Sequence, residues 1–230
     1  GQWTIVSGPS LSLAQFSSTT SGSAVFTPSG GAGMYTLRWT VSNSPCTDAT
    51  DDVIITVNPV PTADAGTPQT ICENGSAILS ATFTNGVGIW SVISGPSLSG
   101  TQFADNSDAA TTFTPSGGMG MYTLRWVVTS SGCPDATDDV VITVNGLPSG
   151  DAGINQAICG NASASLSASF VNGTPQWSVV SGPSLLSSQF SNTSSPTATF
   201  TPAGGAGTYI LRWTVTNAPC AAFTDDVEII

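Results

Sequence analysis

The chain has 230 residues, with three Lys and Arg against 14 Asp and Glu, no His, and a formal net charge of -11. Nucleic-acid binding needs a basic surface that neutralises phosphates, and three arginines cannot provide one. No apolar run approaches the roughly 18 residues of a membrane-spanning helix. Only 7% of the residues are charged, so the abundant Ser and Thr must supply most of the polar surface. This composition is typical of secreted β-rich proteins, and it excludes nucleic-acid-binding proteins and proteins with a membrane-spanning helix.

The sequence repeats itself every 87 residues without insertion or deletion. A period of this length exceeds the roughly 20–50 residues of solenoid repeats and matches a whole small domain. We therefore expect separate domains in tandem rather than one continuous stack. The spacing relates Trp3, Trp90 and Trp177, as well as Ser7-Gly-Pro-Ser10, Ser94-Gly-Pro-Ser97 and Ser181-Gly-Pro-Ser184, and also Leu37-Arg-Trp39, Leu124-Arg-Trp126 and Leu211-Arg-Trp213.

Two short linkers rich in Pro and Gly divide the chain, at Val57-Asn-Pro-Val-Pro61 and Val144-Asn-Gly-Leu-Pro148. They predict the C-terminal part of an Ig-like repeat at 1–58, a complete repeat at 59–145 and a nearly complete repeat at 146–230. The first of these lacks its opening strands. Short linkers that contain proline restrict the tilt between neighbouring domains, so we expect a semi-rigid rod.

Within the complete repeat, runs of strand length alternate between apolar and polar residues or are rich in β-branched residues, and turn residues bound each run. No segment has a sustained period of 3.6 residues, which argues against helices. The sequence therefore predicts an all-β protein of tandem Ig-like, PKD-like seven-stranded antiparallel β-sandwiches. The predicted strands are Gln69–Cys72, Ser76–Phe83, Val87–Ile93, Thr101–Phe103, Ala109–Thr114, Met121–Thr129 and Asp138–Asn145.

Aromatic residues recur at fixed places in the repeat and predict its core. A Tyr opens the sixth strand after a glycine-rich turn, which resembles the tyrosine corner of Ig-like domains, where the hydroxyl bonds back to the chain just upstream. We interpret these tyrosines as structural rather than ligand-binding. The predicted core residues are Trp39, Trp90, Trp126, Trp177, Trp213, Tyr122 and Tyr209, and Tyr35 holds the same position in the first repeat.

The segments Ala63-Asp-Ala-Gly66, Gln69-Thr-Ile-Cys72 and Asn74-Gly-Ser76, the Phe-Thr-Pro…Tyr-Thr-Leu hairpin and the closing Asp-Asp-Val strand carry a family resemblance. The pattern resembles the PKD-like and Ig-like repeats of Bacteroidetes surface proteins, including the gliding-motility adhesins exported by type IX secretion. Trp90-Ser-Val-Ile stands where typical PKD domains have Trp-Asp-Phe-Gly-Asp-Gly. The resemblance implies a secreted protein at the cell surface.

The five cysteines form two series of period 87, one of Cys46, Cys133 and Cys220 and one of Cys72 and Cys159. The absence of His and of any Cys-x-x-Cys pair argues against a metal site. Two cysteines in each small exported repeat suggest a disulfide. The simplest pairing is within a repeat, Cys72–Cys133 and Cys159–Cys220. The periodicity is equally compatible with a link between neighbouring repeats, Cys72–Cys220.

Enzymatic chemistry is not expected. The chain has neither His nor Lys, so the usual bases that activate a nucleophile are missing. Acidic residues near the joints suggest a calcium site that would stiffen the rod, although Ala222 replaces the Asp48 and Asp135 of the other repeats. The alternative is that they keep an edge strand soluble. No other cofactor is expected, and the candidate calcium ligands are Asp51, Asp52, Asp64, Asp138, Asp139 and Asp151.

The three basic residues occupy one recurring position on the outward face of the sixth strand. Because side chains alternate along a strand, each Arg points away from the Leu and Trp that flank it. We expect each to form an ion pair with a nearby Asp within the sheet. These residues are Arg38, Arg125 and Arg212.

These observations predict a repeat segment of a large secreted adhesin or filament, acting as a semi-rigid stalk for surface adhesion or gliding motility. Its expected partners are neighbouring repeats of the same chain, and in addition surface polysaccharide or other copies of itself. One alternative is a carbohydrate- or surface-binding module in a secreted multidomain protein. Another is a laterally packing fibre subunit, which exposed apolar residues around Ser94-Gly-Pro-Ser-Leu98 would favour.

Overall fold

The computed structural model describes residues 1–160 and 162–230. The described chain consists of strands and loops, apart from three single 3-10 turns. It packs as two compact units, 1–64 with 82–89 and 126–138, and 65–81 with 90–125 and 139–230. We refer to residues 1–58, 59–145 and 146–230 as the first, second and third repeats. The joint between the first two repeats lies in one unit, and the joint between the last two lies in the other.

The first repeat forms one three-stranded antiparallel sheet in the order β1-β2-β3. Its strands are β1 (Gln2–Ser7), β2 (Gly33–Val41) and β3 (Ala49–Val57), with the turn η1 (Leu13–Gln15) between the first two. Strand β3 is the edge of this sheet.

The second repeat contains a four-stranded sheet in the order β5-β11-β10-β8 and two strand pairs, β4 with β7 and β6 with β9. Its elements are β4 (Thr62–Asp64), β5 (Gln69–Cys72), β6 (Ala77–Ile78), β7 (Thr82–Thr84), β8 (Val87–Ser94), η2 (Gly100–Gln102), β9 (Thr112–Phe113), β10 (Gly120–Thr129) and β11 (Ala136–Asn145).

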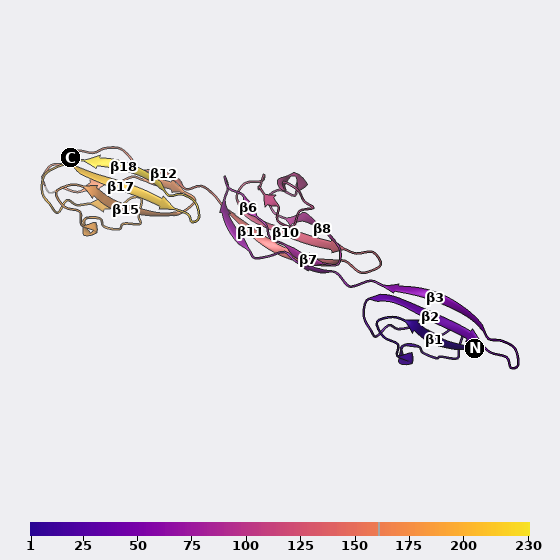
Figure 1. Ribbon diagram of the computed structural model, residues 1–230. Helices are drawn as coiled ribbons and strands as arrows, with labels where there is room; N and C mark the ends of the chain where they lie inside the picture. The colour runs from indigo at the N-terminus through magenta and orange to yellow at the C-terminus, as the bar shows by residue number, and fades with distance from the viewer. Residues whose placement is uncertain (161) are drawn as a thin grey trace. The chain divides into compact units, whose positions relative to one another are not determined.

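The third repeat has the same plan, with β15, β17 and β18 side by side in one sheet (Figure 1) and with the pairs β12–β14 and β13–β16. Its elements are β12 (Ser149–Asp151), β13 (Ala164–Ser165), β14 (Ser169–Val171), β15 (Thr174–Ser181), η3 (Ser187–Gln189), β16 (Thr199–Phe200), β17 (Tyr209–Thr216) and β18 (Phe223–Ile229).

The predicted all-β sandwich fold is confirmed, and one pairing within it is parallel. In the second repeat a strand near the start, β5, which we call the opening strand, runs parallel to the closing strand β11. Strand β5 pairs with β11 in parallel, with Cys72 opposite Asn145. The third repeat has the corresponding parallel bridge between Gln156 and Ile229. Side chains alternate in the same way in parallel and antiparallel strands, so the sequence pattern did not reveal the direction. As a result Cys72 lies at the end of β11, beside the linker.

Two predicted strands differ in the structure. The first two residues of the segment Thr101–Phe103 belong to the 3-10 turn η2, which the Ser99 side chain caps by accepting a hydrogen bond from Thr101 N. Phe103 forms only an isolated bridge with Phe113. The predicted strand Ser76–Phe83 is divided into β6 and β7, which pair with different partners. The prediction also missed the short strand β4.

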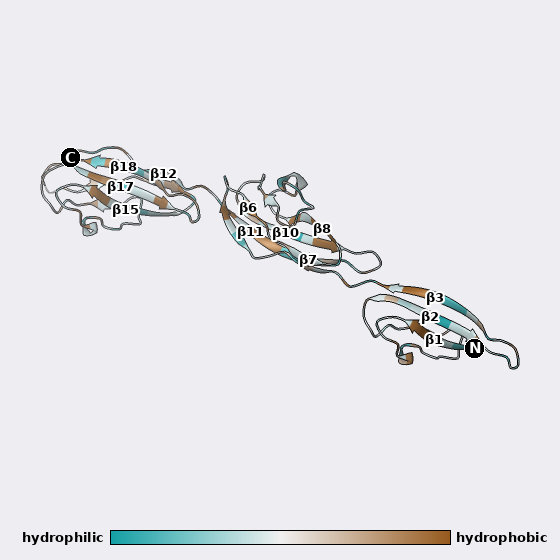
Figure 2. Ribbon diagram, viewed as in Figure 1, coloured by the Kyte–Doolittle hydropathy of each residue, from teal (hydrophilic) through white to brown (hydrophobic). Residues whose placement is uncertain are grey.

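The aromatic residues fill the interior of the two larger repeats. Trp90, Trp126, Trp177, Trp213 and both tyrosines of these repeats are at most 2% exposed. Figure 2 shows that hydrophobic residues concentrate on the strands. Trp39, also predicted as core, is only partly buried. In the second repeat the Phe83 ring, from β7, packs 5.6 Å from the ring of Trp126, which corresponds to Trp39. Residues 1–58 contain no strand that corresponds to β7, so Trp39 lacks this cover.

Candidate functional site: the joints between repeats

Reciprocal hydrogen bonds clasp the linker between the second and third repeats. Asn145, at the end of β11, donates through Nδ2 to the Ala218 carbonyl at 2.7 Å. Asn217, in the β17–β18 loop, donates through Nδ2 to the Gly146 carbonyl at 2.8 Å. A linker whose carbonyls are bonded to the following repeat has few conformations left to it. This joint is therefore built as a contact and not as a free hinge.

A third asparagine holds the same linker from its other side. Asn172 Nδ2 donates to the Leu147 carbonyl at 3.2 Å, from a backbone φ of 54° that Asn tolerates better than most residues. A Cβ at Gly146 would lie 2.6 Å from Asn172 Nδ2, so only glycine fits there without a shift. The surroundings thus explain the Asn-Gly pair of the linker.

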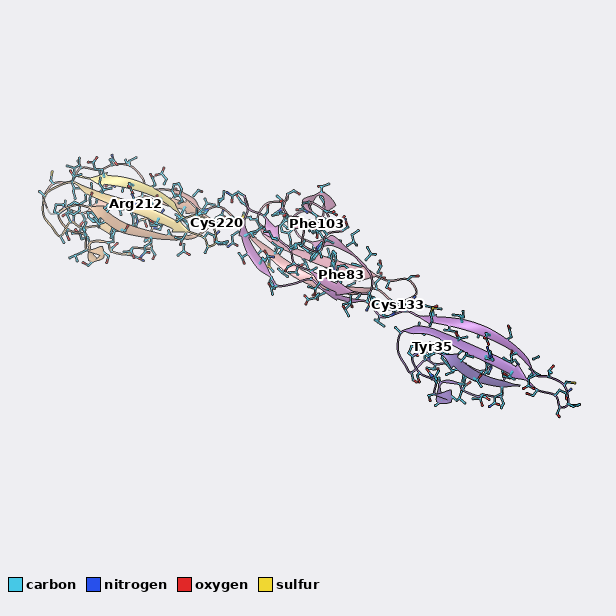
Figure 3. All side chains as sticks on the ribbon, in the orientation of Figure 1. Tyr35, Phe83, Phe103, Cys133, Arg212 and Cys220 are labelled. Atoms are coloured by element: carbon cyan, nitrogen blue, oxygen red, sulfur yellow. A yellow bond between two sulfur atoms is a disulfide. The ribbon has the colours of Figure 1, made fainter. Side chains whose placement is uncertain are left out.

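A disulfide between Cys72 and Cys220 closes this joint covalently. The Cα atoms of the two cysteines are 5.3 Å apart, and the cysteines are separated by 148 positions in the sequence. Cys72 ends the opening strand of the second repeat, whereas Cys220 lies in the β17–β18 loop of the third, with its Sγ 3.6 Å from the Asn145 carbonyl oxygen. In Figure 3 Cys220 lies at the end of its repeat where the linker enters.

The predicted pairing within the third repeat, Cys159–Cys220, is wrong. Cys159 follows Ile158, whose N–H bonds to the Ile230 carbonyl at the end of β18. Cys220 precedes the start of the same strand, seven residues long. At about 3.3 Å per residue the two cysteines lie about 20 Å apart, whereas a disulfide requires Cα atoms within about 7 Å.

The pairing Cys72–Cys133 is wrong for the same reason. Cys72 stands opposite Asn145 at the end of β11, and Cys133 comes before the start of that strand. The alternative link between neighbouring repeats is the one that forms. Cys46 and Cys159 are free and exposed, and Cys133 is free and partly buried.

The joint between the first and second repeats has corresponding hydrogen bonds from asparagine side chains. Asn58 Nδ2 donates to the Ser131 carbonyl at 2.6 Å, as Asn145 does to Ala218. Asn85, at a φ of 57°, donates to the Val60 carbonyl at 3.1 Å. The Cys133 thiol lies 3.8 Å from the Asn58 carbonyl oxygen and 3.6 Å from that of Pro59. Cys133 thus holds the place of Cys220 at the other joint.

The tyrosine corner forms in all three repeats. Each hydroxyl donates to a glycine carbonyl four residues upstream and accepts from the N–H one residue before it, as Tyr209 does with Gly205 at 3.1 Å and Gly204 at 3.1 Å. A Cβ at Gly182 would lie 2.6 Å from the Tyr209 ring, which explains the glycine of the Ser-Gly-Pro-Ser loop. All three tyrosines thus make the hydrogen bonds of a tyrosine corner.

A buried glutamine that was not predicted from the sequence fixes the loop between β15 and β16. Gln189 is 3% exposed, and its Nε2 donates to the carbonyls of Ser184 and Leu186 at 3.0 and 2.9 Å. Its Oε1 accepts from Ala203 N at 2.8 Å. The recurrence of this glutamine every 87 residues was the available signal. Its counterparts Gln15 and Gln102 make the same three bonds.

The arginines form the predicted ion pairs on the outward sheet face. In each pair Nε and one terminal nitrogen bind the two oxygens of a single carboxylate, at 2.7 and 2.8 Å. The partners face each other across β-ladder pairs such as Arg212↔Asp226. The pairs are Arg38–Asp52, Arg125–Asp139 and Arg212–Asp226.

These contacts bear on the calcium hypothesis. The carboxylates of Asp52 and Asp139 are each occupied by an arginine. Asp225, which corresponds to Asp51 and Asp138, accepts from Ala152 N at 2.8 Å, and Asp151 accepts from Gly153 N. Among residues 1–160 and 162–230, no three His, Cys, Asp or Glu side chains are close enough together to hold a metal ion. The structure does not gather the predicted ligands into one site.

The ion pairs predict a small loss of stability in acid. The hydrogen bond from Arg212 lowers the pKa of Asp226 and outweighs the opposing effect of partial burial. A carboxylate with a lowered pKa in the folded state stabilises above its unfolded pKa of about 4, and this contribution disappears as the pH falls through the folded value. We expect Asp226→Asn to lower Tm by at most about 2 °C at pH 6, because the pair is exposed.

Thermal melts followed by circular dichroism, recorded over the pH range in which carboxylates titrate, measure this loss. The difference in Tm between Asp226→Asn and wild type should shrink as the pH falls from about 4 to about 2. Asp108→Asn serves as the control, because Asp108 is exposed and is not a member of the three arginine–aspartate pairs. A difference that persists unchanged at pH 2 would contradict this account of the pair.

No helix in the described part of the chain is long and apolar enough to cross a membrane. No family model matches the sequence, and no curated protein matches it either. The solved structures of similar fold include human CDH23 EC21–23, with TM-score 0.50 and 10% identity, covering 100% of this chain and 88% of that one. Sidekick-1 immunoglobulin domains 1–5 match with TM-score 0.50 and 13% identity, over 100% of this chain and 53% of that one. These likenesses show a fold of tandem Ig-like β-sandwich domains.

Proposed function

We propose that the chain is a segment of a secreted cell-surface adhesin or filament, in which the repeats act as a semi-rigid stalk for surface adhesion or gliding motility. The observation that carries this proposal is the joint. Two successive linkers are clasped by asparagines at corresponding positions, and one is closed by Cys72–Cys220. A spacer that transmits force or keeps a distance needs restricted joints, whereas a string of independent binding domains does not.

Further support comes from the surface. The four tryptophans of the two larger repeats are buried, so they offer no platform on which a sugar ring could stack. The exposed strand faces carry Ser, Thr and arginine–aspartate pairs that are already satisfied. A disulfide that spans a joint is also the chemistry of an oxidising, extracellular compartment. The family resemblance points the same way.

Negative-stain electron microscopy of the purified, oxidised chain tests the stalk. We expect single particles in which the second and third repeats keep a narrow range of angles, and a wider range after reduction with dithiothreitol. Compact particles would contradict the proposal. Ordered bundles would instead favour lateral assembly, for which the chain offers one leucine in each repeat, Leu11, Leu98 and Leu185, each about 60% exposed.

A further inference from the structure

The joint between the first and second repeats has a thiol where the next joint has a disulfide. Cys133 holds the place of Cys220, with the same spacing of 87 residues and with its sulfur against the corresponding linker carbonyls. The partner of Cys220 is 148 residues upstream. The same interval from Cys133 leads to a position before Gly1. Within residues 1–230, no cysteine holds the position relative to Cys133 that Cys72 holds relative to Cys220.

The edge of the first repeat is independently suited to receive an opening strand. Strand β11 pairs on its outer side with β5, which delivers Cys72 beside Asn145. Strand β3 has the corresponding sequence, Thr50-Asp-Asp-Val-x-Ile-Thr-Val-Asn58, and is the edge of its sheet. A strand placed on β3 as β5 is on β11 would end next to Asn58, and so next to Cys133.

The interior of the first repeat is also open where an opening segment would pack. Val53 is 43% exposed, whereas its counterpart Val140 is 1% exposed. A cleft of about 200 Å³ lies between Trp3, Trp39 and Val53. In the third repeat Phe170, from β14, packs 6.1 Å from Trp213, which corresponds to Trp39. The place that this cleft has in the first repeat is thus filled in the third repeat by an aromatic side chain from β14.

We propose that Cys133 is one half of a second disulfide across a joint, whose other half is a cysteine at the end of an opening strand paired in parallel with β3. The inference goes beyond the stalk function, because it assigns a covalent partner to this thiol. Two thiols lose two protons and two electrons as the S–S bond forms. A small disulfide such as oxidised glutathione accepts them and is released as two molecules of thiol.

The test supplies the opening segment from the chain itself. Gly1 corresponds to Gly88, so a copy of residues 59–87 placed directly before Gly1 completes the first repeat and brings a copy of Cys72 with it. The full extended chain is refolded with a mixture of reduced and oxidised glutathione, alkylated, digested without reduction and mapped by mass spectrometry. The matched control carries Ser at the added cysteine.

We expect a peptide that joins the added cysteine to Cys133, together with the Cys72–Cys220 peptide as an internal measure of correct folding. Free thiols should then be confined to Cys46 and Cys159, whereas the Ser control should also leave Cys133 free. Two results would overturn the proposal in a chain that forms Cys72–Cys220. One is alkylated Cys133 beside an unpaired added cysteine, and the other is a peptide joining the added cysteine to Cys46. The stalk function is judged separately, by microscopy of the original chain.

Discussion

Pulled from its two ends while oxidised, the chain should lengthen far less than when reduced. The force passes directly from Cys72 to Cys220, whose sequence separation is 148 residues, so the segment between them is not stretched even when it unfolds. About 80 residues remain in the load path, which extend to roughly 280 Å, against roughly 800 Å for the whole chain at about 3.5 Å per residue. Reduction should therefore add about 500 Å to the final extension.

Single-molecule force spectroscopy measures this difference as total contour length. The double variant Cys72→Ser, Cys220→Ser should extend to the full length in both redox states. Cys133→Ser, which removes a thiol at the other joint, should behave as wild type. An oxidised wild-type chain that releases the full length would show that no bond joins the second repeat to the third.

This result would matter for the stalk. A disulfide within one repeat protects only that repeat, whereas Cys72–Cys220 encloses most of two. Its loop contains the remainder of the second repeat, the linker and the third repeat up to the β17–β18 loop, without β18. On the chain-entropy model a loop of this length lowers the entropy of the unfolded state by the equivalent of about 5 kcal/mol. The larger consequence is mechanical, because repeats inside the loop can unfold under load without lengthening the tether.

The repeat, its strands and its aromatic core could be predicted from the sequence because each depends on a local pattern or on strict recurrence. The tyrosine corner followed from the position of a Tyr after a glycine-rich turn, and the Arg–Asp pairs followed from alternation along a single strand. The disulfide could not be assigned in this way. Its pairing depends on the direction in which β5 lies against β11, and a parallel and an antiparallel partner present the same alternation. Once the pairing is parallel, Cys72 reaches the next repeat and cannot reach Cys133.

The loop between β8 and β9 shows the opposite kind of failure. Thr101–Phe103 of the second repeat has the composition of a strand, but a serine cap and a buried glutamine fix a 3-10 turn there. Three backbone bonds to one side chain decide the conformation, and local propensity gives no account of them. The recurrence of Gln15, Gln102 and Gln189 was visible in the sequence, but its meaning depends on a burial that only the fold supplies.

Replacement of this glutamine should therefore be costly. Gln189→Leu keeps a side chain of similar size but leaves the Ser184 and Leu186 carbonyls and the Ala203 N–H without the partner they have in the wild type. A buried polar group that loses its hydrogen bond costs about 1–3 kcal/mol, so we expect the third repeat to lose about 2–4 kcal/mol. The three bonds share one side chain, so their individual costs should not simply add.

Hydrogen–deuterium exchange assigns this loss of stability to individual amides of the third repeat. The opening free energy of amides in β17 should fall in Gln189→Leu, while amides of the first repeat should keep theirs. Gln176→Leu is the matched control, because Gln176 lies exposed on β15 of the same repeat. Equal protection in the two variants would show that the turn is held by the Tyr209 corner and the core alone. A loss specific to Gln189→Leu would show that the loop conformation depends on one amide, which the aromatic core cannot replace.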